Sequence, residues 1–406
     1  LEQAIDQAVQ HNRTLDNAEM DVGKAADELA AERTKRLPKL DLGLSENYNL
    51  SSQSFTFPAG LFGPIPTEDV KLDARTGFTT VVSARVKQPL SDLYRIGLSN
   101  DQVEVNEDIA DQELRSRRQT MIRDVKQAYY NILKAQNELT STEASISFYR
   151  ELDQLVDRYY QEQTVLKYET MEVKSRLARA EHDAFTERNR LATEREKLNK
   201  LLGREVATAF SVAPVGIDQL AVPSHAEAES AAIEQRPEVN TSRLKLKHAQ
   251  YGYRIKKSEY IPHIDLQYRY TRLYNTDFIP DKESAIGLTA RWEFYDWGRK
   301  SQDLSKKSLV IQQARNEIEE AESQVIIEVN RRMRDLEDAR NLVSVTSITQ
   351  AAQQEKLRVL MNQYRQQTVL LDDVLKAERE LTFANTEHNN AQLSVWTAQS
   401  ELQKAM

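Results

Sequence analysis

Hydrophobic side chains recur at seven-residue intervals along two long segments of the chain. The positions are Val125, Ile132, Leu139, Ile146 and Tyr160 in the first segment and Val329, Leu336, Val343, Leu357 and Tyr364 in the second. This spacing is typical of helices packed as coiled coils. Because no proline interrupts either segment, we predict helices over 91–162 and 297–366, each about 100 Å long at 1.5 Å per residue. Returning helices are predicted over 167–202 and 370–405.

Four shorter segments alternate between apolar and polar residues. In GFTTVVSARVKQ, one face carries Phe78, Thr80, Val82, Ala84 and Val86. This pattern predicts β-strands over 38–50, 77–90, 262–275 and 284–296. Each strand is about as long as a tilted strand that crosses a membrane. Alternation alone fits half-buried hairpins of a soluble protein equally well.

The chain contains an internal repeat, which determines how its elements are grouped. The tetrapeptide QTVL at Gln163 recurs at Gln367, 204 residues later, and LSDLYR and FYDWGR are aligned by the same offset. LPKLDL and IPHIDL are 224 residues apart. We therefore predict two repeats, at 1–202 and 226–406, which begin with helices over 1–37 and 226–260.

The residues between the repeats form a predicted connector at 203–225. This segment is rich in Gly and Pro and has no helical period, as expected of a linking or equatorial segment. Within it, we predict one short strand over 207–212.

Composition excludes several classes of protein. Acidic and basic residues are interleaved and the formal net charge is −8, which argues against a nucleic-acid surface. Charged residues make up 29% of the chain and the mean hydropathy is −0.65. No segment therefore reaches the roughly 18 apolar residues that a membrane-spanning helix needs.

Motifs for catalysis or metal binding are missing from the sequence. There is no cysteine, and the six histidines are scattered, so neither a thiolate cluster nor an HExxH site can be built. No GxSxG nucleophile elbow occurs. We predict a protein that is not an enzyme and that uses no cofactor and no metal.

The predicted strands favour a membrane location because two hairpins at the ends of such long helices have no evident soluble core to cover them. Four strands cannot close a barrel, and open strand edges are not tolerated in hydrocarbon. Two chains would supply eight strands and leave little lumen, whereas three would supply twelve, enough for a pore. A homotrimer is the smallest assembly expected to form a channel.

These parts resemble the TolC-like outer-membrane efflux proteins. The resemblance rests on two repeats of helix, strand hairpin, long helix, turn and returning helix. LPKLDL and IPHIDL lead into strands, and KQPLSDLYR and EFYDWGR lead out of them. The resemblance implies a mainly α fold with a small β part. Tandem-repeat helical hairpins would form a periplasmic tunnel, and four transmembrane strands per chain would join a shared 12-stranded trimeric barrel.

The resemblance also implies a function and a location. The trimer would lie in the outer membrane of a Gram-negative bacterium, in contact with outer-membrane lipid and with a large part in the periplasm. It would accept substrates from an inner-membrane transporter through a periplasmic adaptor, also called a membrane fusion protein. The alternative, from another class, is a soluble periplasmic coiled-coil adaptor or scaffold protein.

QTVL is expected to be the helical turn at the periplasmic tip of each repeat. By position, the surface that docks the adaptor or the pump would comprise Gln163, Thr164, Val165, Leu166, Gln367, Thr368, Val369 and Leu370. The family turn commonly begins with Gly, where this chain has glutamine twice. QTVL could equally be a turn kept by duplication, and the two roles are compatible.

The resemblance places a periplasmic gate just beyond these turns, at Glu169, Tyr364 and Asp373. Three Asp373 carboxylates converging on a threefold axis would repel one another and favour cations. The alternative for Asp373 is a solvated carboxylate in the first turn of a helix, where the helix dipole favours it. Val369 and Lys376 stand where the family pattern has an arginine and a second acid, so one link and one ring of that gate are missing.

Three aromatic residues near the end of the last predicted strand are expected to anchor the protein at the membrane surface. They are Trp292, Tyr295 and Trp297, and aromatic side chains favour the boundary between membrane and water. The loop FTFPAGLFGPIP of the first hairpin, at 55–66, would then face the cell exterior.

Overall fold

The structure is a computed structural model of residues 1–406 that describes all of them except 217–223 and 277–279. Its helices are α1 (Glu2–His11), α2 (Arg13–Thr34), α3 (Asp92–Gln161), α4 (Lys167–Leu201), α5 (His225–Gln235), α6 (Pro237–Ser258), α7 (Arg299–Arg365) and α8 (Leu371–Ala405). Its strands are β1 (Lys39–Phe57), β2 (Val70–Pro89), β3 (His263–Tyr274) and β4 (Lys282–Arg291). The predicted mainly helical fold with four strands is confirmed.

The chain divides into two compact units that cut across the repeats. Unit 1 comprises Leu1–Val22, Ala110–Ser242 and Glu317–Met406, and unit 2 comprises Gly23–Ile109 and Arg243–Asn316. Each unit therefore contains parts of both repeats.

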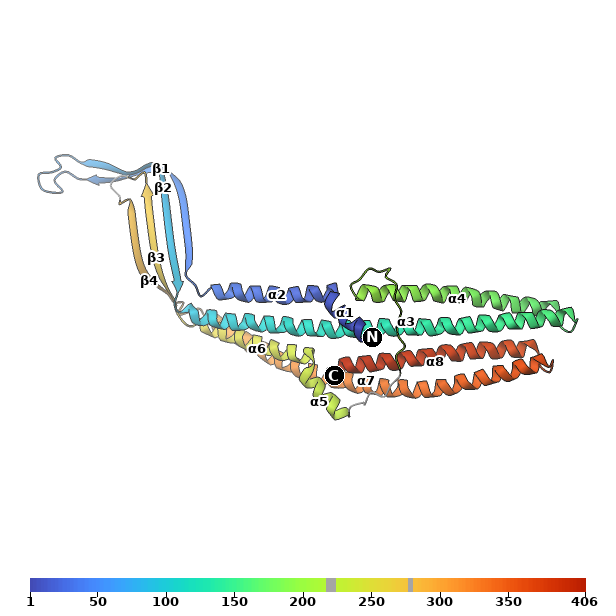
Figure 1. The fold of residues 1–406 in the computed structure, drawn as a ribbon. Coiled ribbons are helices and arrows are strands. Elements are labelled where there is room, and N and C mark those ends of the chain that lie inside the picture. The colour runs from blue at the N-terminus through green and yellow to red at the C-terminus, as the bar shows by residue number, and fades with distance from the viewer. Residues whose placement is uncertain (217–223, 277–279) are drawn as a thin grey trace. The chain divides into compact units, whose positions relative to one another are not determined.

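Unit 1 is built on two antiparallel helical hairpins, α3 with α4 and α7 with α8, which turn back at the same end (Figure 1). Several of the predicted seven-residue positions face inward: Val125, Ile132 and Val329 are fully buried, whereas Tyr160 is 43% exposed. Burying a side chain of this size contributes about 1.5–3 kcal/mol. Packing, rather than helix propensity, therefore holds these long helices together.

Unit 2 contains a four-stranded antiparallel sheet in the order β1-β2-β3-β4. Lys39 lies opposite Lys87 in the first hairpin, and His263 lies opposite Arg291 in the second. Lys39 and His263 are 224 residues apart, and Lys87 and Arg291 are 204 residues apart. These are the offsets of the repeat, so the two hairpins have the same register. Strands β1 and β4 are the open edges of the sheet.

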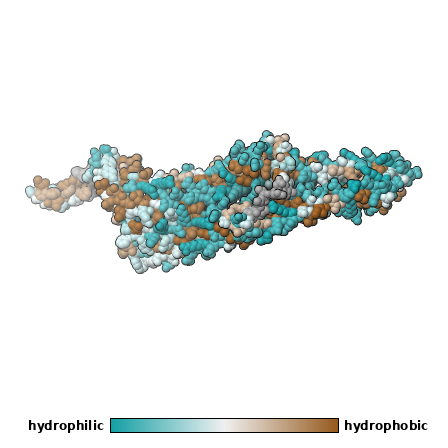
Figure 2. Space-filling model, turned by 60° about the horizontal axis from the view of Figure 1, so that its bottom comes forward, coloured by the Kyte–Doolittle hydropathy of each residue, from teal (hydrophilic) through white to brown (hydrophobic). Residues whose placement is uncertain are grey.

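One face of this sheet is apolar and exposed. Its side chains include Leu40, Leu42, Leu44, Tyr48, Leu50, Ile286 and Leu288, which are between 60% and 94% exposed. Figure 2 shows hydrophobic residues gathered over the strands, at the left of the view. An apolar patch of this kind marks a surface that contacts lipid or another protein. No helix among the described residues is long and apolar enough to cross a membrane.

The helices predicted over 1–37 and 226–260 are each broken in two. The prediction of a continuous helix was wrong in both places. Asn12 ends α1 with extended backbone, and its carboxamide oxygen accepts a hydrogen bond from the N–H of Thr14 at 2.9 Å, which caps α2. Pro237 begins α6, and Arg236 before it is extended. Steric clash disfavours helical backbone for a residue that precedes proline, and Arg236 is accordingly extended, so the helix breaks there.

The strands also differ from their predicted ends. The first hairpin continues to Phe57 and resumes at Val70, so it is longer than predicted, and part of the predicted 55–66 loop is strand. Strand β4 stops at Arg291 instead of 296, because Glu293 is bonded to Arg299 and Lys300 of α7 and not to a neighbouring strand.

The strand predicted over 207–212 is absent, because those residues contact helices and find no strand to pair with. The Asn199 carboxamide donates to the carbonyls of Val206 and Thr208, at 2.7 and 2.8 Å. The hydroxyl of Tyr129 bonds to both the carbonyl and the N–H of Ala213, at 2.9 Å. Side chains of α3 and α4 therefore fix the connector. Its residues 217–223 lie outside the described part of the chain.

Candidate functional site: the helical tips

The two QTVL turns have the same backbone structure. In the first turn, the N–H of Thr164 donates to the carbonyl of Tyr159 at 2.9 Å, and the N–H of Gln163 donates to that of Tyr160 at 3.0 Å. In the second, Thr368 and Gln367 bond in the same way at 3.0 and 2.9 Å. This pair of bonds is the Schellman motif, which satisfies the last carbonyl groups of a helix.

The threonine of each turn adds a further bond. The hydroxyls of Thr164 and Thr368 donate to the same carbonyl groups as their own N–H groups, at 3.0 and 2.9 Å. Threonine thus strengthens the helix end through its side chain as well as its backbone. This hydrogen bond gives a structural reason for threonine at the same position in both turns.

The glutamine of each turn has left-handed backbone, where glycine is usual. Gln163 has φ 59° and Gln367 has φ 57°. A non-glycine residue in this conformation costs about 1 kcal/mol, because its Cβ approaches the following carbonyl oxygen. Both turns are therefore formed at some cost in stability.

Exposure divides the eight tip residues into different groups. Val165 and Val369 are half-buried against the apolar cluster at the tips of the two hairpins. Leu166 and Leu370 are 65% and 73% exposed, although each immediately precedes a helix. Of the predicted docking residues, these two leucines alone are large apolar side chains open to a partner.

Tyr364 is buried at the contact between the two hairpins. Its ring packs edge-on against that of Tyr159, with centroids 5.9 Å apart, and the Tyr364 residue is 4% exposed. Its hydroxyl has no hydrogen-bond partner among the described residues. Burial, followed by the negative charge of Glu169, raises the pKa of Tyr364 to about 12.

Glu169 and Asp373 occupy equivalent positions, each in the first turn of the returning helix. Glu169 lies close enough to Tyr364, on the other hairpin, to act on its hydroxyl through charge, although the two form no hydrogen bond. The Asp373 carboxylate accepts a hydrogen bond from the N–H of Leu370 at 3.3 Å. Asp373 therefore caps α8, as the alternative interpretation of this residue requires, and it remains exposed.

Three contacts between the hairpins were not predicted from the sequence. The Tyr159 hydroxyl donates to the carbonyl of Arg365 at 2.9 Å, and the Arg365 guanidinium pairs with Glu151. Deeper in the hairpins, the buried Tyr149 hydroxyl donates to the buried carboxylate of Glu378. Burial, followed by the bond to Glu378, raises the pKa of Tyr149. These partners are more than 200 residues apart in the chain, so no local pattern connects them.

The three predicted interface aromatics lie together in unit 2, between β4 and α7. Trp292, Tyr295 and Trp297 are 60%, 62% and 87% exposed. The rings of Tyr295 and Trp297 pack with centroids 4.9 Å apart. Their exposure is compatible with contact to a membrane surface.

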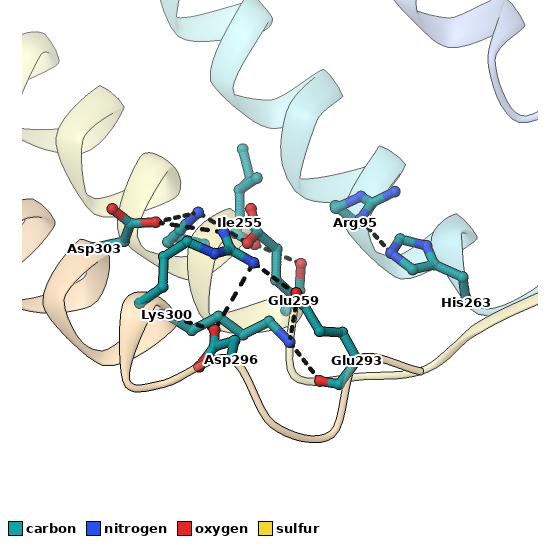
Figure 3. A network of polar contacts seen from close by, with 11 residues as sticks. Arg95, Ile255, Glu259, His263, Glu293, Asp296, Lys300 and Asp303 are labelled. Atoms are coloured by element: carbon teal, nitrogen blue, oxygen red, sulfur yellow. Dashed lines mark hydrogen bonds and ion pairs between the residues drawn. The ribbon is translucent and has the colours of Figure 1, made fainter. Parts of the chain in front are cut away.

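A polar network beside these aromatics fixes the passage from β4 into α7 (Figure 3). The Arg299 guanidinium pairs with the carboxylate of Glu293 at 2.7 Å, and the Lys300 ammonium donates to the Glu293 carbonyl at 2.7 Å. The Asp296 carboxylate accepts from the N–H of Lys300 at 2.9 Å, which caps α7. Glu293 is thus held on the helix side of the junction.

Metal binding finds no support in the described part of the chain. No group of three or more His, Asp or Glu side chains there is placed to hold an ion. The tips combine helix caps, apolar packing and carboxylates.

Comparisons with known proteins agree with this arrangement. A family model described as "Outer membrane efflux protein" matches residues 4–204 and 229–406. The alkaline protease secretion protein AprF of Pseudomonas aeruginosa is 24% identical over 195 residues, an alignment that covers 46% of this chain and 39% of AprF. The match to this curated relative thus spans less than half of its length.

Two solved channels illustrate the structural likeness. The CmeC outer membrane channel of Campylobacter jejuni has a TM-score of 0.80 at 16% identity, covering 100% of this chain and 84% of that chain. The open-state MtrE outer membrane channel of Neisseria gonorrhoeae has a TM-score of 0.78 at 17% identity, covering 99% and 88%. At such identities the likeness shows the fold.

The fold is that of the TolC-like channels, with long paired helices and a four-stranded antiparallel sheet. The chain belongs to the outer membrane efflux protein family. Members of this family are bacterial outer-membrane channels with a large periplasmic helical part, and they work in tripartite systems. Membership excludes an enzyme and decides against the soluble adaptor or scaffold alternative.

Proposed function

We propose that this chain is one of three identical subunits of an outer-membrane channel. The channel passes substrates, delivered by an inner-membrane transporter through a periplasmic adaptor, to the cell exterior. The single observation that carries this proposal is the sheet of unit 2, which combines an exposed apolar face with two open edges.

The chemistry of the sheet supports both parts of this proposal. Unpaired strand edges are unstable in hydrocarbon, because their N–H and C=O groups would lack partners. Leu40, Leu42 and Leu50 would contact lipid, while the opposite face carries Asp41, Ser45 and other polar side chains. Three copies would supply twelve strands, whose polar faces would line the pore.

The tips are the proposed site of gating and docking. Leu166 and Leu370 would contact the adaptor or pump through their exposed apolar side chains. Glu169, Tyr364 and Asp373 would form the periplasmic gate. Support comes from their position at one end of the paired helices and from the electrostatic effect of Glu169 on Tyr364.

Two measurements test the channel proposal. The protein, extracted with detergent from outer membranes, is expected to have the mass of three chains by light scattering with correction for detergent. In planar bilayers it is expected to produce discrete conductance steps. A monomer that needs no detergent to stay in solution would contradict the proposal, as would a trimer that conducts no ions.

A further inference from the structure

The sheet contains a complete example of the joint that its open edges lack. Within the chain, β2 pairs with β3 from Thr80 opposite Tyr274 to Pro89 opposite Asp265. This joint connects the second strand of one hairpin to the first strand of the next. The second strand of the second hairpin, β4, has no such partner and is one edge of the sheet. The first strand of the first hairpin, β1, is the opposite edge.

An ion pair supports the in-chain joint. The Lys87 ammonium lies 2.9 Å from the Asp265 carboxylate across the strands. The repeat offsets place Arg291 at the position equivalent to Lys87, and Asp41 at the position equivalent to Asp265. A basic residue is therefore retained on the β2-type strand and an acidic residue on the β3-type strand.

Arg291 is exposed and has no ion pair among the described residues. The Asp41 side chain is 43% exposed, and the Lys39 ammonium of its own strand lies 3.6 Å from its carboxylate. Glu293, the acid nearest to Arg291 along the chain, is turned toward Arg299 and Lys300 (Figure 3). The Arg291 guanidinium is thus left for an acid beyond the edge of the sheet.

In the shared barrel of the proposed channel, β4 of one copy lies beside β1 of the next copy. We propose that these two strands pair in the register of β2 with β3, and that Arg291 binds Asp41 of that next copy. This inference rests on the proposed trimeric channel and specifies how its subunits join. In this register Arg291 lies opposite Gly43 of the next copy, and Thr289 lies opposite Ser45. Each open edge then gains the backbone partners that it lacks within one chain.

The side chains on both faces fit this joint. On the apolar face, Ile286 comes opposite Tyr48 of the next copy, so that two exposed hydrophobic side chains cover each other. On the polar face, Thr289 and Ser45 bring two hydroxyls together. A register shifted by one residue would instead place polar side chains against the apolar face.

The chain has no cysteine, so engineered cysteine pairs test the register without interference. In the variant with Ser45→Cys and Thr289→Cys, oxidation is expected to link copies into covalent dimers and trimers on non-reducing denaturing gels. The matched control is Arg85→Cys with Arg269→Cys, at the equivalent positions of the in-chain joint. This control is expected to form its disulfide within single chains, which stay monomeric on the gel.

A second control tests the register directly. The variant with Asn47→Cys and Thr289→Cys is shifted by two residues and should link copies at least tenfold more slowly. If this variant formed a trimer as the wild type does but its copies linked faster than those of the Ser45→Cys and Thr289→Cys variant, the proposed register would be overturned. The channel proposal would remain intact. A wild-type protein that is monomeric in detergent would overturn both.

Charge exchange tests the ion pair. Arg291→Asp is expected to make the trimer dissociate in dodecyl sulfate on the order of threefold faster, the effect of losing one cross-strand ion pair. Adding Asp41→Arg should restore the dissociation rate, because the pair is rebuilt in reverse. The ion pair would be overturned if the double variant dissociated at least as fast as the two single-variant rate increases, multiplied together, predict.

Discussion

The two helical tips share one backbone and differ in their side-chain surroundings. Both turns have the same Schellman hydrogen bonds and the same left-handed glutamine. Yet Tyr364 is 4% exposed, whereas its repeat equivalent, Tyr160, is 43% exposed. Duplication has therefore preserved the turns while the contacts around them diverged.

A second equivalent pair shows the same divergence. Lys174 of α4 is exposed and pairs with Asp157 at 3.1 Å, whereas the equivalent Glu378 of α8 is buried against Tyr149. A helix cap depends on residues within a few positions, so it survives duplication. Packing depends on contacts with the neighbouring hairpin, and these contacts differ between the two repeats.

The largest expected effect on stability comes from removing the buried hydrogen bond between Tyr149 and Glu378. Tyr149→Phe removes a donor from the buried Glu378 carboxylate and is expected to lower the free energy of unfolding by about 2 kcal/mol. Lys174→Met, at the position equivalent to Glu378, is expected to change it little, because exposed ion pairs contribute little. Urea unfolding in detergent, followed by circular dichroism, measures both. Equal losses would contradict the difference in packing between Glu378 and its repeat equivalent Lys174.

Glycine at the turns tests what the tips share. Gln163→Gly and Gln367→Gly are each expected to raise the free energy of unfolding by about 0.5–1 kcal/mol, since glycine adopts left-handed backbone without strain. Because both turns have the same geometry, the two gains should be equal within error. Gln163→Val, with a β-branched side chain, should be destabilising. A gain at one turn alone would show that the turns differ.

Alkaline pH tests the burial of Tyr364. An exposed tyrosine in the unfolded chain releases its proton near pH 10, whereas Tyr364 in the folded protein holds its proton to about pH 12. The unfolded state therefore binds fewer protons in this window, and stability falls as pH rises from about 10 to 12. Up to pH 11 this loss should be at most about 1 kcal/mol.

Tyr364→Phe should remove this part of the pH dependence, and Tyr160→Phe is the matched control that should retain it. The measured quantity is the change in unfolding free energy between pH 9 and pH 11. Indistinguishable pH profiles for wild type and Tyr364→Phe would show that this hydroxyl is not buried in the folded protein.

The smallest expected effect concerns the two acids at equivalent positions. If Asp373 forms a ring at the pore entrance, Asp373→Asn should reduce the preference for cations over anions by about twofold in planar bilayers, because three charges are removed. Glu169→Gln should change that preference less, since Glu169 is half-buried beside Tyr364. Unaltered ion selectivity in Asp373→Asn would remove this residue from the constriction.

Local patterns predicted most elements of the fold. The seven-residue spacing identified α3 and α7, and alternation identified all four strands. The break at Pro237 was within reach of the same reasoning, because proline restricts the residue before it. The break at Asn12 was harder to anticipate, since its carboxamide also bonds to the carbonyl of Leu201, far along the chain.

The candidate site divides in the same way. The sequence located both QTVL turns, because the repeat and the end of the helical spacing coincide there. It could not show that Val165 packs inward while Leu166 is exposed, since both are apolar and adjacent. Nor could it pair Tyr149 with Glu378, because that contact depends on how two hairpins pack.

By itself, the sequence determined the repeat, the kinds of secondary structure and the amphipathic sheet, since spacing of apolar residues and turn chemistry act over short distances. The tertiary structure alone decided which equivalent residues became buried and which strands became edges. The reason is physical: burial and strand pairing are properties of two surfaces in contact, and two copies of one sequence motif acquire different neighbours when they fold in one chain.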